Sequence, residues 1–232
     1  MEVLQIILVL LIVVGSVILH ELAHGITAYW LGDNTAKDAG RLTLNPIKHI
    51  DPYMSILVPV VLFMLEAPIF GGAKPVPINT RNLKWGAWGM ALVAIAGPLT
   101  NFLVAFLSFI IGRFTGLLYG SGGAILEFIF NEFLYINIGF MLFNLIPVPP
   151  LDGSRVLYAI APDNFRKILE QLEQYGIIIV YALIVLFGEV FSHLMINGMH
   201  GIIKFFYFIV GAWYDIIELS PVGSMIFLNN HV

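Results

Sequence analysis

The apolar run at residues 3–31 limits the possible folds of this chain more than any other feature of its sequence. A helix needs about 20 residues to cross the roughly 30 Å hydrocarbon core of a bilayer, and this run is longer than that. A signal peptide would carry a positive segment at its start and a site of small residues for cleavage, and neither is found here. The run therefore predicts a retained membrane-spanning helix.

Further long apolar runs occur later in the chain. The chain is 59% hydrophobic and 11% charged, whereas soluble domains are about 45–50% apolar and about 25% charged. We predict an all-α polytopic membrane protein with about five transmembrane helices. It would form a single membrane-embedded domain over residues 1–232, with a core at about 3–157. The further predicted spans are 87–111, 124–146, 176–191 and 199–217.

A shorter apolar segment lies between the first two large spans. Residues 53–67 contain Pro59 and lead into the stretch FGGAKPVPINTRNLK. The alternation in KPVPIN is typical of a strand, and Gly71 with Gly72 would supply a turn. We expect a partly inserted, re-entrant β-hairpin that makes no net crossing. Irregular backbone is tolerated at membrane depth only against protein or a wet cavity, so this hairpin would lie against the rest of the protein or a wet cavity.

Basic residues in the loops predict the orientation of the spans, because cytoplasmic loops are rich in Lys and Arg. One group lies between the first two large spans and another follows the third. The first and third spans would therefore both run from outside to inside, with their C-terminal parts near the cytoplasmic face. The basic residues are Lys37, Arg41, Lys48, Lys74, Arg81 and Lys84 in the first group, and Arg155, Arg166 and Lys167 in the second.

Composition also excludes several classes of function. The chain has no cysteine, which excludes disulfides, thiolate metal ligands and a cysteine nucleophile. Its formal net charge is −4 and it has no basic run, so we expect no nucleic-acid partner.

The motif HELAH lies within the first predicted span. His20 and His24 are four residues apart, so they share one helix face and can bind one Zn²⁺ together. Glu21 could reach a metal-bound water and act as a general base. The alternative is a buried network of hydrogen bonds. Polar groups inside a membrane are costly and mark functional sites by default, which favours the metal site.

A catalytic zinc ion needs a third protein ligand and one open position. Asp152 in NLIPVPPLDG follows the third span, whose predicted direction brings it to the same face as the two histidines. The prolines would break the helix at Ile146 and leave the following segment extended. The alternative is that Asp152 caps a helix beginning at Gly153 and Ser154.

With HELAH on one span and NLIPVPPLDG on a later one, the chain resembles the site-2 protease family of intramembrane zinc metalloproteases. AGPLTNF at residues 96–102 matches the Gly-Pro-x-x-Asn pattern of that family, and GGAKPVPIN resembles a hairpin near its active site. The resemblance covers about residues 15–157. It looks like a short, core-only form, because the longest polar segment, about residues 152–175, is shorter than the roughly 50 residues of a PDZ or CBS domain.

The resemblance implies that one Zn²⁺ per chain is bound by His20, His24 and Asp152, and that Glu21 activates the water on it. It also implies that Asn144 helps to hold the substrate or the oxyanion, and that Asn101 lies in the core near the site as a second candidate for substrate or transition-state binding. The alternative for Asn101 and Asn144 is hydrogen bonding between helices. His49 is expected to be solvated.

The predicted function is therefore intramembrane cleavage of transmembrane protein substrates, within the lipid bilayer of a prokaryotic cell membrane and toward its cytoplasmic side. Two other classes stay open. A divalent-metal transporter can also place His and acidic groups on membrane helices. The chain could instead be a catalytically silent membrane scaffold. The sequence does not predict an oligomeric state.

Overall fold

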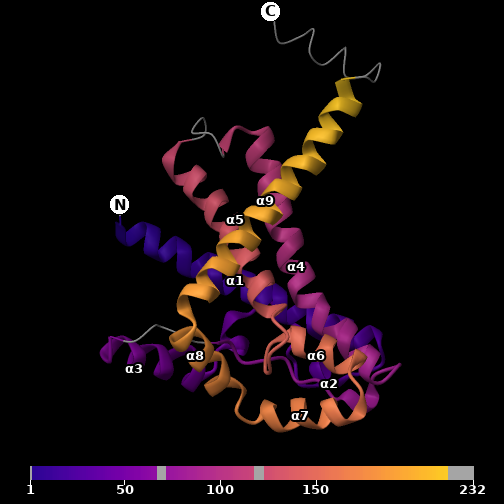
Figure 1. Cartoon of the computed structure of the whole chain (residues 1–232). Coiled ribbons are helices and arrows are strands. Elements are labelled where there is room, and N and C mark those ends of the chain that lie inside the picture. The colour runs from indigo at the N-terminus through magenta and orange to yellow at the C-terminus, as the bar shows by residue number, and fades with distance from the viewer. Residues whose placement is uncertain (1, 67–71, 118–122, 219–232) are drawn as a thin grey trace, which may run out of the picture.

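The computed structural model describes residues 2–66, 72–117 and 123–218, and these residues form helices joined by turns and extended segments, without a strand (Figure 1). The elements are α1 (Glu2–Trp30), α2 (Thr35–Asp38), η1 (Pro46–His49), η2 (Pro52–Leu57), α3 (Val58–Met64), η3 (Thr80–Asn82), α4 (Ala87–Phe114), α5 (Ala124–Asn144), α6 (Asp152–Ile160), α7 (Asp163–Glu173), α8 (Gly176–Leu186) and α9 (Gly188–Glu218).

Four of the described helices are long and apolar enough to cross a membrane, namely α1, α4, α5 and residues 188–211 of α9. The bent pair of α7 and α8 would make a fifth, with an angle of 84° between its helices. The predicted all-α polytopic fold is confirmed, and the chain is an integral membrane protein.

The predicted boundaries of the last two spans were wrong. The apolar run at 176–191 was expected to be one helix, but α8 ends at Leu186 and α9 begins at Gly188. The backbone leaves the helical region at Phe187, with φ −121° and ψ 26°. Because α8 has 11 residues, it is roughly 16 Å long, about half of the hydrocarbon core. Hydropathy reports an apolar environment and does not report where a helix bends.

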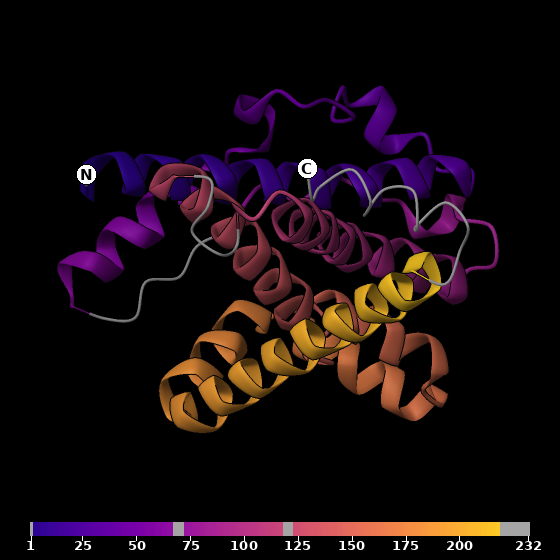
Figure 2. The same ribbon diagram turned by 90° about the horizontal axis from the view of Figure 1, so that it is seen from above.

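Helix α4 is at the centre of the bundle, where it packs against α1, α5 and α6. Figure 2 shows α4 and α5 lying between α1 on one side and α9 on the other. Phe206 of α9 is fully buried, and its ring centroid lies 5.3, 4.9 and 5.5 Å from those of Phe102, Phe106 and Phe109 on α4. These aromatic contacts hold α9 against α4.

The segment between the first two large spans is a short apolar helix and not a crossing. Residues Pro52–Met64 form η2 and α3, which together measure roughly 20 Å. This length agrees with the prediction that the segment makes no net crossing.

The predicted strand at KPVPIN was wrong. Residues 72–79 are extended but pair with no other strand among the described residues, and Gly71 of the predicted turn lies outside them. Pro75 and Pro77 carry no backbone N–H, so every second position lacks the donor that a β-ladder requires. The alternation of the sequence is real, but the prolines remove the hydrogen-bond donors along one edge of the segment.

The backbone of this extended segment is instead hydrogen-bonded to a backbone carbonyl of η1 and to a side chain of α1. The N–H of Lys74 donates to the carbonyl of His49 at 2.8 Å, and the N–H of Val76 donates to Oε2 of Glu21 at 2.8 Å. His49 is itself 3% exposed, and its Nε2 lies 2.9 Å from the carbonyl of Thr43. The expectation that His49 is solvated was therefore wrong, because its side chain is buried and its ring contacts the carbonyl of Thr43.

Asp33 joins the end of α1 to the chain that precedes α4. Its buried carboxylate accepts bonds from the N–H and hydroxyl of Thr35 at 3.1 and 2.5 Å, and from the N–H of Asn79 at 2.7 Å and Nδ2 of Asn82 at 3.0 Å. Burial raises the pKa of Asp33, but the hydrogen bonds from these three residues outweigh burial and hold the pKa below its usual value.

We predict that Asp33→Asn lowers the free energy of unfolding in detergent by about 1–3 kcal/mol at pH 7. The donors of Thr35, Asn79 and Asn82 would lose the charged carboxylate that accepts their hydrogen bonds. A carboxylate with a lowered native pKa contributes stability above its unfolded pKa of about 3.9, and this contribution is lost as the pH falls through the native value. The difference in thermal midpoint between the native protein and the variant should therefore shrink below about pH 4.

The matched control is Asp38→Asn, which changes an exposed carboxylate on α2 and should leave the midpoint unchanged at pH 7. A difference for Asp33→Asn that stays constant from pH 7 to pH 3 would contradict the role assigned to the ionised carboxylate.

Candidate metal centre

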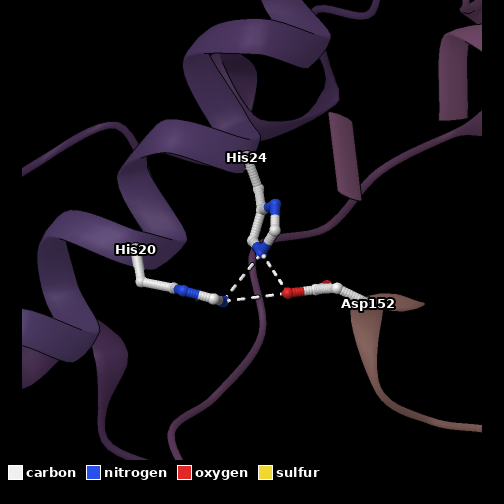
Figure 3. Close-up of side chains that lie close together, drawn as sticks. All are labelled: His20, His24 and Asp152. Atoms are coloured by element: carbon white, nitrogen blue, oxygen red, sulfur yellow. Dashed lines mark hydrogen bonds and ion pairs between the residues drawn. The ribbon is translucent and has the colours of Figure 1, made fainter. Parts of the chain in front are cut away.

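His20, His24 and Asp152 converge on one point in the structure, as Figure 3 shows. Both histidines lie on α1, one turn apart, and Asp152 is the first residue of α6. The two Nε2 atoms are 3.0 Å apart, and Oδ2 of Asp152 lies 3.2 Å from Nε2 of His20 and 3.4 Å from Nε2 of His24. All three residues come from positions at which the sequence predicts zinc ligands.

The other ring nitrogen of each histidine is held by an oxygen atom on α4. Nδ1 of His24 lies 2.7 Å from the carbonyl oxygen of Val93, which can only accept a hydrogen bond. Nδ1 of His20 lies 2.5 Å from Oδ1 of Asn101. Both Nδ1 atoms therefore carry the proton, and the two Nε2 lone pairs turn toward Asp152. Two such lone pairs 3.0 Å apart cannot bond to each other when both rings are neutral.

This donor set fits a zinc ion. Ligand atoms about 2.0–2.1 Å from tetrahedral zinc are roughly 3.3 Å from one another, close to the three distances found here. Oδ2 of Asp152 is buried and accepts no hydrogen bond from the described residues, although both imidazoles lie within ion-pair distance. Two imidazoles and one carboxylate are the ligands of a catalytic zinc site with one position open.

Gly97 of α4 makes room for the two imidazoles. A Cβ atom at this position would lie 2.5 Å from Nε2 of His24 and 2.6 Å from Cε1 of His20. The next residue, Pro98, has no N–H for the carbonyl of Ala94, so the helical bonding of α4 is interrupted beside the site. The Gly-Pro pair thus belongs to the packing of the metal centre.

Gly153 allows Asp152 to reach the histidines. A Cβ atom on Gly153 would lie 2.2 Å from the carbonyl oxygen of Leu145, so only glycine lets α6 begin against the end of α5. Asp152 is the first helical residue and Leu151 is the N-cap, so the alternative that Asp152 caps this helix does not hold. The segment before Asp152 was expected to be extended, but it forms turns. The N–H of Val148 donates to the carbonyl of Ile146, and the N–H of Leu151 donates to the carbonyl of Val148.

The remaining predicted residues lie on α1, α4 and α5. Glu21 is half-buried on α1 and accepts the N–H of Val76. Asn144 ends α5, and its Nδ2 donates to the carbonyl of Phe140 at 3.0 Å. Asn101 is fully buried, and its amide bonds His20 and a second asparagine on α5, which favours the interhelical role left open for it.

That second asparagine, Asn137, was missed by the sequence analysis. It is fully buried in the apolar stretch FLYINIGF of α5 and bonds both Asn101 and Ser16. An amide in the middle of an apolar membrane helix was the signal that could have identified it, because such groups are rarely placed there without a partner.

Comparison with known proteins gives consistent results. The model of peptidase family M50 matches residues 122–188. "Putative zinc metalloprotease YwhC" of Bacillus subtilis is 39% identical over 200 residues, which cover 82% of this chain and 87% of that protein. "Putative zinc metalloprotease Rip2" of Mycolicibacterium smegmatis is 30% identical over 174 residues, which cover 73% of this chain and 63% of that protein. No solved structure matches the chain.

We predict that Gly97→Ala abolishes zinc retention, because its methyl group would occupy the space of both imidazoles. The measurement is metal content of the protein purified in detergent, with Gly201→Ala on α9 as control because a Cβ there meets nothing within 4 Å. Full zinc retention in Gly97→Ala would show that the metal is not held between these histidines.

Proposed function

The chain belongs to peptidase family M50 and is a zinc metalloprotease, and we propose that it cleaves peptide bonds of membrane-spanning substrates within the bilayer. The observation that carries this proposal is the meeting of His20, His24 and Asp152 beside a glutamate, on a helix long and apolar enough to span the membrane. The chain would hold one Zn²⁺ at these three ligands.

His20, His24 and Asp152 would hold the zinc ion, and the chemistry it would supply is polarisation of the scissile carbonyl and a lowering of the pKa of water toward about 7. Glu21 then accepts the proton of the attacking water and delivers it to the leaving amine. Its Oε2 is held by the N–H of Val76, which orients the carboxylate. Its other oxygen has no hydrogen-bond partner among the described residues, so that oxygen is available to take the proton.

Asn144 supports substrate binding in this proposal. Only one N–H of its amide is used within α5, by the carbonyl of Phe140, so the other can donate to a substrate or oxyanion oxygen. A helical substrate hides its own backbone groups, so it must be partly unwound before attack. The loops rich in Lys and Arg support a site toward the cytoplasmic side. The bacterial relatives support a prokaryotic cell membrane.

A metal transporter would need successive ligand sites along a path. Among the residues that the structure describes, His20, His24 and Asp152 are the one group of three or more side chains placed to hold a metal ion. This favours one catalytic centre over a path of ion sites.

We predict that Glu21→Gln keeps its zinc but loses about 10²–10⁴-fold in cleavage rate, because the amide cannot accept a proton. Asp152→Ala should lose both zinc and activity, since a ligand is removed. The measurements are metal content and cleavage of a single-span substrate in proteoliposomes, with Glu189→Gln as an exposed-carboxylate control.

Retained cleavage by Glu21→Gln would refute the role of Glu21. Zinc flux into the proteoliposomes that is abolished by His20→Ala, without cleavage of any substrate, would favour the transporter. Stable zinc binding with neither cleavage nor flux would favour a silent scaffold.

A further inference from the structure

A chain of buried hydrogen bonds connects three membrane helices behind His20. Asn137 on α5 donates from Nδ2 to the carbonyl of Phe133 at 2.8 Å and to Oγ of Ser16 at 2.9 Å. Its Oδ1 accepts from Nδ2 of Asn101 at 2.8 Å, and Oδ1 of Asn101 lies 2.5 Å from Nδ1 of His20. Ser16, Asn101 and Asn137 are each 0% exposed. No water is needed to complete this chain of bonds.

The direction of every bond in this chain follows from one backbone carbonyl. The oxygen of Phe133 can only accept, so the Nδ2 end of Asn137 must face it and the Oδ1 end must face Asn101. That Oδ1 in turn requires Nδ2 of Asn101, which leaves Oδ1 of Asn101 toward His20. His20 must then carry its proton on Nδ1, and its Nε2 lone pair is left for the metal.

Turning over either amide would bring two donors or two acceptors together in a buried site. An unsatisfied buried polar group costs about 1–3 kcal/mol, and water cannot relieve it here. The arrangement therefore selects one tautomer of His20 before any metal arrives. Partners of this kind behind a metal ligand typically change metal affinity by about 10–100-fold when they are removed.

We propose that Asn137 is a positioning residue of the metal centre, which acts through Asn101 to hold His20 in its metal-binding tautomer. The proposal rests on the zinc site proposed above. It assigns zinc affinity, and not only helix packing, to a residue that touches neither metal nor substrate.

The first test is the zinc dissociation constant, measured by chelator competition on the full chain in detergent. Asn137→Leu should weaken zinc binding by about 10–100-fold, because Asn101 loses the acceptor that orients its amide. Asn137→Asp in its neutral form should keep native affinity, since one carboxyl oxygen still accepts from Asn101 while the protonated oxygen donates to the carbonyl of Phe133. Asn197→Leu on α9 is the matched control, because this asparagine is exposed.

Two further variants keep the test decisive. If Asn137→Leu does not fold, Asn137→Ser replaces it, because a serine hydroxyl can bond the carbonyl of Phe133 but is too short for Asn101. It should show the same loss of affinity. Ser16→Ala should keep native affinity, since the carbonyl of Phe133 alone sets the direction of the Asn137 amide.

The second test reads the tautomer without metal. Nitrogen NMR of ring-labelled apoprotein, with His20 assigned from His20→Gln, should show the Nδ1 proton in the native chain and a changed signal in Asn137→Leu. Equal zinc affinity and an unchanged signal in a folded Asn137→Leu or Asn137→Ser would overturn the proposal. Failure of the native chain to bind zinc at all would instead refute the proposed function.

Discussion

Buried polar groups of an apolar bundle must find their partners within the protein, and the metal centre is arranged around this constraint. Each histidine has two ring nitrogens, and only one of them can serve the metal. On both rings the other nitrogen is held by an oxygen of α4, from the carbonyl of Val93 or the amide of Asn101. Helix α4 thus determines which ring nitrogen of His20 and of His24 carries the proton.

Close approach of the backbones is the second requirement, and it explains the small residues near the site. Gly97 leaves space for both imidazoles, and Gly153 lets α6 begin against the end of α5. The metal centre needs both features at once, because hydrogen bonds of about 2.5–3 Å can form only where the helices lie this close together. Gly97 and Gly153 therefore allow the close helix packing on which the hydrogen bonds of the buried amides depend.

The convergence of His20, His24 and Asp152 could be predicted from the sequence because its determinants are local or topological. The spacing of His20 and His24 places them on one helix face, and the shared direction of two spans brings Asp152 to their end. Alternation wrongly predicted a strand at KPVPIN, because the prolines remove the donors along one edge of that segment. The break at Phe187 and the partner of Asn137 depend on bending and rotation of helices, which hydropathy does not encode.

The two histidines differ in how securely their tautomers are held. His24 is bonded to a backbone carbonyl, which no side-chain substitution can remove while α4 remains helical. His20 depends on two amides in series, either of which a single substitution can change or turn over. The affinity of the centre can therefore be adjusted through His20 without altering a ligand or the helix packing at His24.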